Sequence, residues 1–280
     1  MTTAAVLTAF FASGAIAAPD NNAYFSLIRT EPGQLAPIGW TRLAVPAELS
    51  RISRDGFYAD AFYSDKTKQI VIAFRRLNPI PFVNMGTYAT DNLILYGVAP
   101  EKYDGDVLRF VEAVKQTAAQ QSPPLSTGAD NVFVTGNSLG AYGAQVAAKA
   151  FHYGGVGFAG PGIPGYRSPE VRPDNFVNYL RYGDPVANHG ADTGIGWSGW
   201  PAATDPGDHY GRIERLGKAG DQIALRAAVT LAAAPTSVPG ANFAAAAGLL
   251  AMGVEIGLWH MSPRYKSPLG IETLPQQGGG

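Results

Sequence analysis

The sequence predicts an α/β fold in which helices cover both faces of a mostly parallel central sheet. Short apolar runs rich in β-branched residues alternate along the chain with segments that have the apolar periodicity of helices. One such run, residues 131–136, leads directly into a helical segment rich in Ala and Gly. The 280 residues contain no repeat and no long linker, so we expect a single domain over residues 1–280.

Six strands and four helices are expected, and their alternation favours parallel pairing of the strands. The strands are placed at residues 56–64, 69–75, 131–136, 155–159, 176–182 and 212–216. The helices are placed at residues 104–120, 139–151, 219–233 and 242–259. Residues 91–97 fit a strand as well as a helix.

The composition argues against several classes of function. Lys and Arg number 21 and Asp and Glu 22, so there is no basic excess to bind a nucleic-acid backbone. Without cysteine the chain can form neither a disulfide nor a thiolate metal site. The four histidines lack the HExxH spacing of a zinc hydrolase. We therefore expect no metal and no nucleic-acid partner.

The N-terminal segment leaves localisation open between secreted and cytoplasmic. Residues 1–18 end in the small triplet Ala15-Ile16-Ala17, which resembles a signal-peptidase site. The first basic residue is Arg29, however, whereas a secretory signal begins with a basic region. An Ala-rich packed helix is the alternative.

A second apolar segment, residues 242–259, has just the length needed to span a bilayer. Glu255 lies within it, and small residues dominate. We therefore favour a buried helix, or part of a helical cap or lid over residues 222–259.

The strongest functional signal is Gly136-Asn137-Ser138-Leu139-Gly140, a G-x-S-x-G sequence between a predicted strand and a predicted helix. A sharp turn in this context raises the serine hydroxyl above the sheet in a strained conformation, and a Cβ atom at either glycine would collide with the neighbouring strand or helix. The N–H of Leu139, at the helix start, would point at a developing oxyanion. We therefore predict that Ser138 is a nucleophile, and the alternative is a Gly-rich helix start capped by Ser138. Three small residues are expected to keep the helix close to the sheet: Ala141, Gly143 and Ala144.

A serine nucleophile needs a base and a carboxylate that orients the base, and both follow the serine in the chain of α/β-hydrolases. Asp184 follows the predicted strand 176–182, so it would lie at the same sheet edge as Ser138. We predict that Asp184 is the acid, and the alternative is a turn-forming Asp before Pro185. Weaker candidates lie in a Gly- and Pro-rich loop: Asp192, Asp205 and Asp208.

All four histidines are candidates for the base. His152 ends the helix that follows Ser138, which directs it away from the turn. His189 lies close to Asp184 in the chain, and His209 precedes a predicted strand. His260 is favoured because it lies late in the chain among apolar neighbours, while His189 and His209 stay open.

Four segments in order resemble the class 3 (fungal-type) lipases of the α/β-hydrolase superfamily, over roughly residues 56–265. Residues 71–75, VIAFR, resemble the family's strand VAFRG[ST], and residues 135–140 resemble its elbow TGHSLG. Residues 157–162 resemble its FGxPGVG turn, and residues 178–186 resemble its NxxDxVP acid loop.

The resemblance implies an α/β-hydrolase fold, a three-layer sandwich, with the catalytic triad Ser138, Asp184 and His260. His209-Tyr210-Gly211 resembles the family's structural HxG, which favours His260 over His209 as the base. Two departures stand out. Asn137 replaces the usual His of the elbow, and Arg76-Leu77 replaces G[ST] at the position of the first oxyanion donor. Leu77 would donate through its backbone N–H alone, and Arg76 is the alternative donor.

Together these features predict a serine ester hydrolase, a lipase or esterase, that acts on acyl lipids without a cofactor. Apolar residues at 78–83, where the family has its lid, and at 241–259 favour a fatty-acyl chain and transient contact with a lipid interface. The alternatives are a toxin-like phospholipase and an inactive hydrolase fold that binds lipid or protein. Residues 155–160 also match G-x-G-x-x-G, but they follow a helix and run into Pro161, so we reject a nucleotide site.

Overall fold

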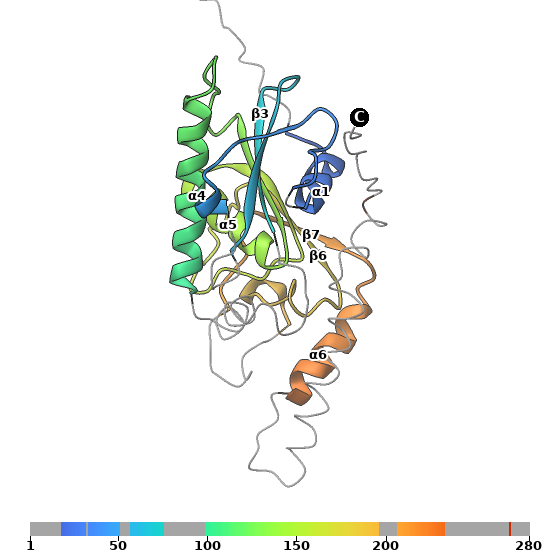
Figure 1. The fold of residues 1–280 in the computed structure, drawn as a ribbon. Helices are drawn as coiled ribbons and strands as arrows, with labels where there is room; N and C mark the ends of the chain where they lie inside the picture. Colours follow the sequence, from blue (N-terminus) through green and yellow to red (C-terminus); the bar gives the residue numbers. More distant parts are fainter. Residues whose placement is uncertain are drawn as a thin grey trace, which may run out of the picture.

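The computed structural model describes residues 18–31, 33–50, 57–75, 99–195, 206–232 and 269. They form a central sheet flanked by helices (Figure 1). The strands are β1 (Thr41–Arg42), β2 (Ala59–Ser64), β3 (Gln69–Phe74), β4 (Val132–Asn137), β5 (Gly154–Phe158), β6 (Phe176–Arg181) and β7 (Arg212–Leu216). The helices are α1 (Asn21–Arg29), α2 (Ala47–Ser50), α4 (Glu101–Ala119), α5 (Leu139–Phe151), the 3-10 helix η1 (Ala191–Thr193) and α6 (Asp221–Ala232).

The described part of the sheet has seven strands, which follow one another in space in chain order from β1 to β7. β1, β2 and β3 pair antiparallel, and every later neighbour pair from β3 to β7 is parallel. The predicted mostly parallel sheet is therefore confirmed. Because these strands run in one direction, the carboxyl ends of β3 to β7 lie at one edge of the sheet.

Helices cover both faces of the sheet, as predicted, with α4 and α5 on one face and α1 on the other (Figure 1). The side chains of β3 alternate accordingly. Ile70, Ile72 and Phe74 join the core that includes α4 and α5, and Val71 and Ala73 join the core that includes α1. All five are fully buried, and each large apolar side chain contributes about 1.5–3 kcal/mol when it leaves water.

α4 packs along the sheet through buried side chains at helical spacing: Tyr103, Val107, Phe110, Val111, Val114 and Ala118. Its first turn carries Glu101 and Asp104, whose charges complement the positive end of the helix dipole. The helix begins at Glu101, three residues before the predicted start, and Pro100, which cannot donate a backbone hydrogen bond, occupies the N-cap position.

Most predicted elements agree with the observed ones to within three residues at each end, and the helix at 139–151 and the strand at 212–216 have the observed bounds. The prediction missed α1, β1 and α2, which are short and lack a long periodic pattern. The predicted helix 242–259 and the ambiguous residues 91–97 lie outside the described residues, as do residues 1–17. Of the proposed cap, residues 222–232 belong to α6, and the remainder also lies outside.

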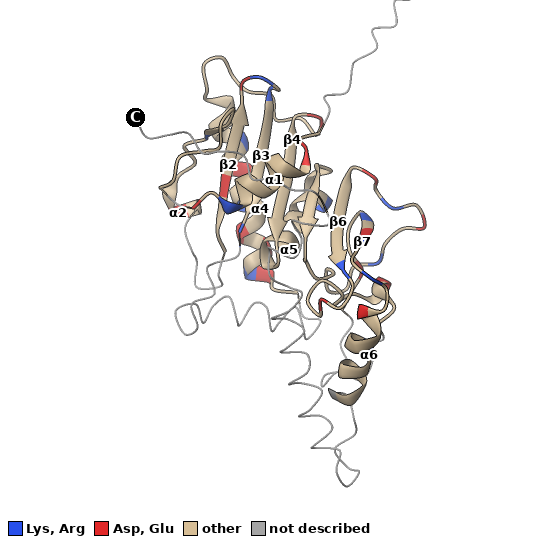
Figure 2. Ribbon diagram, turned by 90° about the vertical axis from the view of Figure 1, so that its right-hand side faces the viewer, with Lys and Arg blue, Asp and Glu red and all other residues tan. Residues whose placement is uncertain are grey.

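α6 extends beyond the carboxyl edge of the sheet (Figure 1). Acidic and basic residues are interspersed along the ribbon (Figure 2), and the whole sequence has a net charge of −1. Within the described ranges, no helix combines the length and the apolar character needed to cross a bilayer.

Candidate active site

Ser138 joins β4 to α5 in a strained backbone conformation, with φ 58° and ψ −125°. This region is unfavourable for a residue with a side chain and costs about 1–3 kcal/mol. Ser138 stands at the N-cap position of α5, but its side chain makes no capping hydrogen bond to the helix, so the alternative of a serine that caps α5 through its side chain is not supported. A strand, a strained serine and a helix in this order form the turn known as a nucleophile elbow.

Two glycines allow the elbow to form, for the steric reason predicted from the sequence. A Cβ atom on Gly136 would lie 2.1 Å from the carbonyl oxygen of Gly140, and one on Gly140 would lie 2.3 Å from the carbonyl oxygen of Phe74. Both contacts are with backbone, which cannot move aside. The turn is therefore closed by direct contact between the start of α5 and the end of β3.

Gly143 does not face the sheet, so its predicted role was wrong. A Cβ atom on Gly143 would lie 3.0 Å from the hydroxyl of Tyr103 and 3.3 Å from Cγ2 of Val107, and both residues belong to α4. Gly143 therefore allows the close approach of α4 to α5. Ala141 faces the turn after β5, because a Cβ atom on Gly160 would lie 2.7 Å from the Cβ atom of Ala141.

The elbow is also tied to β5, since the N–H of Ser138 donates to the carbonyl of Phe158 at 2.9 Å. Leu139 is the first residue of α5 and is buried. The first N–H groups of a helix have no intrahelical acceptor and carry a positive partial charge, so they can stabilise an anion. Leu77 and Arg76, the predicted source of the second oxyanion donor, lie outside the described residues.

Asp184 lies three residues beyond the end of β6, at the carboxyl edge of the sheet, and is fully buried. Its Oδ1 accepts hydrogen bonds from the N–H groups of Val186 at 3.0 Å and Ala187 at 3.1 Å. A turn-forming aspartate makes such bonds, so the alternative interpretation of Asp184, a turn-forming residue before Pro185, is correct for its Oδ1 atom. The same bonds fix the orientation of the carboxylate.

The loop after Asp184 is held by Asn188, which sequence analysis did not single out. The Asn188 amide donates to the carbonyls of Arg181 at 2.8 Å and Asp184 at 2.7 Å, and its Oδ1 accepts from Arg215 of β7. Thr193 closes the loop by donating to the carbonyl of Asn188 at 2.7 Å. The carboxylate of Asp184 therefore belongs to a loop with an internal hydrogen-bond network.

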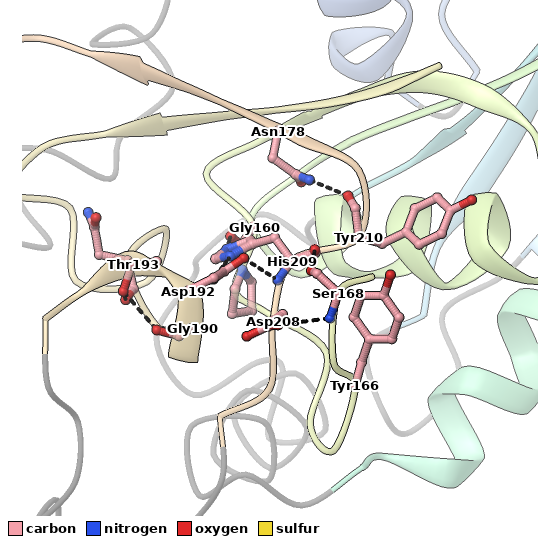
Figure 3. A network of polar contacts seen from close by, with 12 residues as sticks. Gly160, Tyr166, Ser168, Asn178, Gly190, Asp192, Thr193, Asp208, His209 and Tyr210 are labelled. Atoms are coloured by element: carbon pink, nitrogen blue, oxygen red, sulfur yellow. Dashed lines mark hydrogen bonds and ion pairs between the residues drawn. The ribbon is translucent and has the colours of Figure 1, made fainter. Parts of the chain in front are cut away.

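His209 lies in a second network, shown in Figure 3. Its ring Nδ1 lies 2.8 Å from Oδ1 of Asp192, and its Nε2 lies 3.0 Å from the carbonyl oxygen of Gly160. The backbone N–H of His209 donates to the other oxygen of Asp192 at 2.9 Å, and Arg172 donates to that same oxygen at 2.8 Å. Both nitrogens of this fully buried ring therefore face acceptor oxygens.

The charge balance of this network favours an ionised Asp192. Burial raises the pKa of the Asp192 carboxyl, but hydrogen bonds and charge from His209, together with the bond from Arg172, outweigh burial and hold that pKa well below its usual range. The network joins the turn after β5 to η1 and to the segment before β7 (Figure 3). Its partners are far apart in the chain, so the resemblance of residues 209–211 to a structural HxG indicated a structural role for His209 but none of its partners.

The other histidines lie in different places. His152 is the C-cap of α5, at the opposite end of that helix from Ser138. His189 is buried, and its carbonyl accepts from the N–H of Gly162 at 2.8 Å. His260 lies outside the described residues, so its relation to Ser138 stays a prediction.

The structure supports the rejection of a nucleotide site at residues 155–160. Gly155 and Gly157 lie within β5, and no helix follows before β6, which begins at Phe176. A Cβ on Gly155 would lie 1.9 Å from the carbonyl oxygen of Val134, so this glycine serves the packing of the sheet. Within the described ranges, no group of three or more His, Cys, Asp or Glu side chains could hold a metal ion.

Comparisons with known proteins find resemblance at the level of structure only. No protein-family model matches the sequence, and no curated protein does. Extracellular lipase LipA from Serratia marcescens is 22% identical with a TM-score of 0.40, and the match covers 55% of this chain and 29% of that one. Lip2 lipase from Yarrowia lipolytica is 12% identical with a TM-score of 0.33, over 48% of this chain and 57% of that one. A triacylglycerol lipase from Penicillium expansum is 15% identical with a TM-score of 0.37, over 70% and 76%.

The chain spans less than two thirds of the Serratia and Yarrowia enzymes, and all three TM-scores lie below 0.5. The antiparallel β2, the parallel strands β3 to β7 and the elbow after β4 define an α/β-hydrolase fold.

Proposed function

We propose that the chain is a serine carboxylic-ester hydrolase that acts on acyl lipids. The observation that carries the proposal is the backbone of Ser138, with φ 58° and ψ −125° between β4 and α5. A fold retains such strain where the strain is used, and in hydrolases of this class it presents the serine hydroxyl to the substrate.

In the proposed reaction, the oxygen of the Ser138 hydroxyl attacks the ester carbonyl carbon, and His260 takes the hydroxyl proton. The tetrahedral intermediate collapses to an acyl-enzyme, and the proton passes from His260 to the departing alcohol. Water then attacks the acyl group, again with His260 as base, and the proton passes from His260 to the Ser138 oxygen as the fatty acid is released. Asp184 holds the imidazole in its orientation and stabilises its charged form.

The oxyanion of the intermediate would accept hydrogen bonds from the N–H groups of Leu139 and Leu77. Loss of one such donor typically costs about 10²–10³ in rate. The position of Leu139 at the first turn of α5 supports its part in this scheme. Leu77 follows the end of β3 by three residues, and β3 adjoins β4 in the sheet.

The placement of the acid agrees with the scheme. Asp184 follows β6, and β5 separates β6 from β4, so the two chain segments lie about 10 Å apart at one sheet edge. That spacing leaves room for an imidazole ring between a serine and a carboxylate. Burial of Asp184 and its two backbone bonds favour a fixed orientation.

The bonding of His209 supports His260 as the base. Each ring nitrogen of His209 faces an acceptor oxygen, of Asp192 or of the Gly160 carbonyl, so neither nitrogen is left to take a proton from Ser138. His152 lies at the far end of α5. His189 is the remaining competitor, and it is included in the test.

Hydrolysis of p-nitrophenyl esters from C2 to C16 tests the proposal, together with labelling by a fluorophosphonate that reacts with activated serines. Ser138→Ala and His260→Ala should each abolish hydrolysis, and Ser138→Ala should also abolish labelling. His189→Ala should retain both reactions. The chain-length profile would separate a lipase from a short-chain esterase.

Loss of activity in His189→Ala with retention in His260→Ala would move the base to His189. A folded wild-type protein that neither hydrolyses the esters nor binds the fluorophosphonate would refute the proposal. Phospholipid vesicles with released fatty acid as the readout, in the same variants, would show whether a phospholipid is the substrate.

A further inference from the structure

The hydroxyl of Tyr103 reaches from α4 to the first residue of α5. It donates to the carbonyl oxygen of Leu139 at 3.1 Å. Tyr103 is fully buried, and its ring packs edge-on against Phe57 with 5.7 Å between ring centres. Phe57 in turn contacts Phe74 and Phe110, so the hydroxyl is presented from a rigid aromatic cluster.

A second bond runs in the opposite direction. Tyr142, one turn into α5, donates its hydroxyl proton to Oδ2 of Asp104 on α4 at 3.3 Å. The Tyr142 N–H donates to the carbonyl of Ser138 at 3.1 Å, so Tyr142 is bonded directly to the elbow. The rings of Tyr103 and Tyr142 lie 6.0 Å apart. Each helix therefore contributes one tyrosine that bonds to the other.

These contacts act on the part of α5 that the proposed reaction uses. The strained turn at Ser138 is held on one side by backbone contacts of Gly136 and Gly140 with neighbouring chain. On the α4 side, the Tyr103 hydroxyl would lie 3.0 Å from a Cβ on Gly143, so the glycine leaves just enough space for this hydroxyl. The first turn of α5 is thus held between β3 and α4.

We propose that Tyr103, supported by the reciprocal pair Tyr142 and Asp104, is a positioning residue for the nucleophile elbow. The inference rests on the proposed function, because it assigns these side chains a part in the reaction at Ser138. In this scheme Tyr103 acts through the carbonyl of Leu139 and not on the substrate. It fixes the first turn of α5, whose N–H groups would face the oxyanion.

Hydrogen bonds between buried groups also stabilise folds in general, so the test must separate positioning from stability. Tyr103→Phe removes only the hydroxyl and leaves the aromatic cluster in place. Tyr153→Phe is a matched control, because the Tyr153 hydroxyl also donates to a backbone carbonyl, that of Thr127 at 3.4 Å. Tyr153 is buried and follows the opposite end of α5, about 20 Å from Ser138 along the helix.

The experiment measures kcat, KM and the rate of fluorophosphonate labelling of Ser138, with a thermal melt of each variant. Tyr103→Phe should lower kcat and the labelling rate about tenfold and leave KM within about twofold, since misplaced catalytic groups affect the chemical step more than binding. Tyr142→Phe should act in the same direction with a smaller effect. Tyr153→Phe should leave both rates within about twofold of the wild type.

Equal rates in Tyr103→Phe and Tyr153→Phe, with an active wild type, would overturn the positioning role and leave the proposed function intact. A wild type that is folded but unreactive would overturn the proposed function and this inference with it. If Tyr103→Phe fails to fold, Tyr142→Phe decides: an unchanged labelling rate in that variant would overturn the inference.

Discussion

Replacing Asp104 with Asn should change how the stability of the protein depends on pH. Burial raises the pKa of the Asp104 carboxyl to about 6, against a smaller lowering effect of the bond from Tyr142. Oδ1 of Asp104 is buried and has no hydrogen-bond partner within the described chain. The charged form of this carboxyl is therefore destabilised in the folded protein.

The pKa gives the direction and the size of the effect. Below about pH 4 the carboxyl is neutral in both the folded and the unfolded chain, so folding carries no free-energy penalty for burying a charge. Between pH 4 and pH 6 the unfolded chain ionises first, so the free energy of unfolding falls as the pH rises, and the loss is complete above pH 6. A rise in pKa from 3.8 to about 6 corresponds to at most about 3 kcal/mol, less the part screened by solvent.

Asp104→Asn keeps the oxygen that accepts from Tyr142 and removes the charge. The difference in the free energy of unfolding between Asp104→Asn and the wild type should therefore be larger at pH 8 than at pH 4.5, by up to about 2 kcal/mol, because about a third of the loss in the wild type has already occurred at pH 4.5. Urea unfolding at the two pH values measures this difference. Asp65→Asn is the control, because the Asp65 side chain is 86% exposed. The effect of this substitution on the free energy of unfolding should be similar at the two pH values. The same difference from wild type at both pH values in Asp104→Asn would refute the reasoning.

Three further variants test other parts of the structure. Gly140→Ala places a Cβ 2.3 Å from the carbonyl oxygen of Phe74 and should lower stability by about 3 kcal/mol or more, or prevent folding, as a thermal melt would report. Phe110→Ala empties a fully buried site and should cost about 3–5 kcal/mol in urea unfolding, and a loss below 1 kcal/mol would contradict the packing described. Asp192 has a lowered pKa, so it stabilises the fold above about pH 4, and that contribution disappears as the pH falls below 4. Asp192→Asn should be less stable than wild type at pH 7, and the difference between the two should begin to shrink by pH 3, whereas a constant difference would contradict this sign.

The sequence predicted those features that short-range sterics determine. Gly136 and Gly140 stand within two residues of Ser138, so the elbow could be inferred from five residues. Apolar periodicity placed α4 and α5 correctly because both helices are long. α1 was not predicted because its nine residues, NNAYFSLIR, include two Asn and a β-branched Ile, which have low helix propensity. Burial of Tyr24, Phe25 and Leu27 against the rest of the fold stabilises this helix instead.

Contacts between distant segments could not be predicted. His209 and Asp192 are 17 residues apart in the chain. The carbonyl oxygen that faces the other ring nitrogen of His209 belongs to Gly160, which is 49 residues from His209. The family resemblance alone gave His209 a structural role, without its partners. Asn188 and Tyr103 carried no signal, since a single Asn or Tyr in a sequence indicates no partner. The places of Leu77 and His260 stay predictions.

The contact between Gly140 and the carbonyl of Phe74 has a consequence for engineering this protein. The backbones of Gly140 and Phe74 touch there without an intervening side chain. The distance between the end of β3 and the start of α5 therefore does not depend on the size of any side chain. Substitutions within residues 136–141 cannot widen or narrow it in small steps. A library that seeks altered chemistry should therefore leave these six positions fixed and diversify the loops that enter and leave the same edge of the sheet.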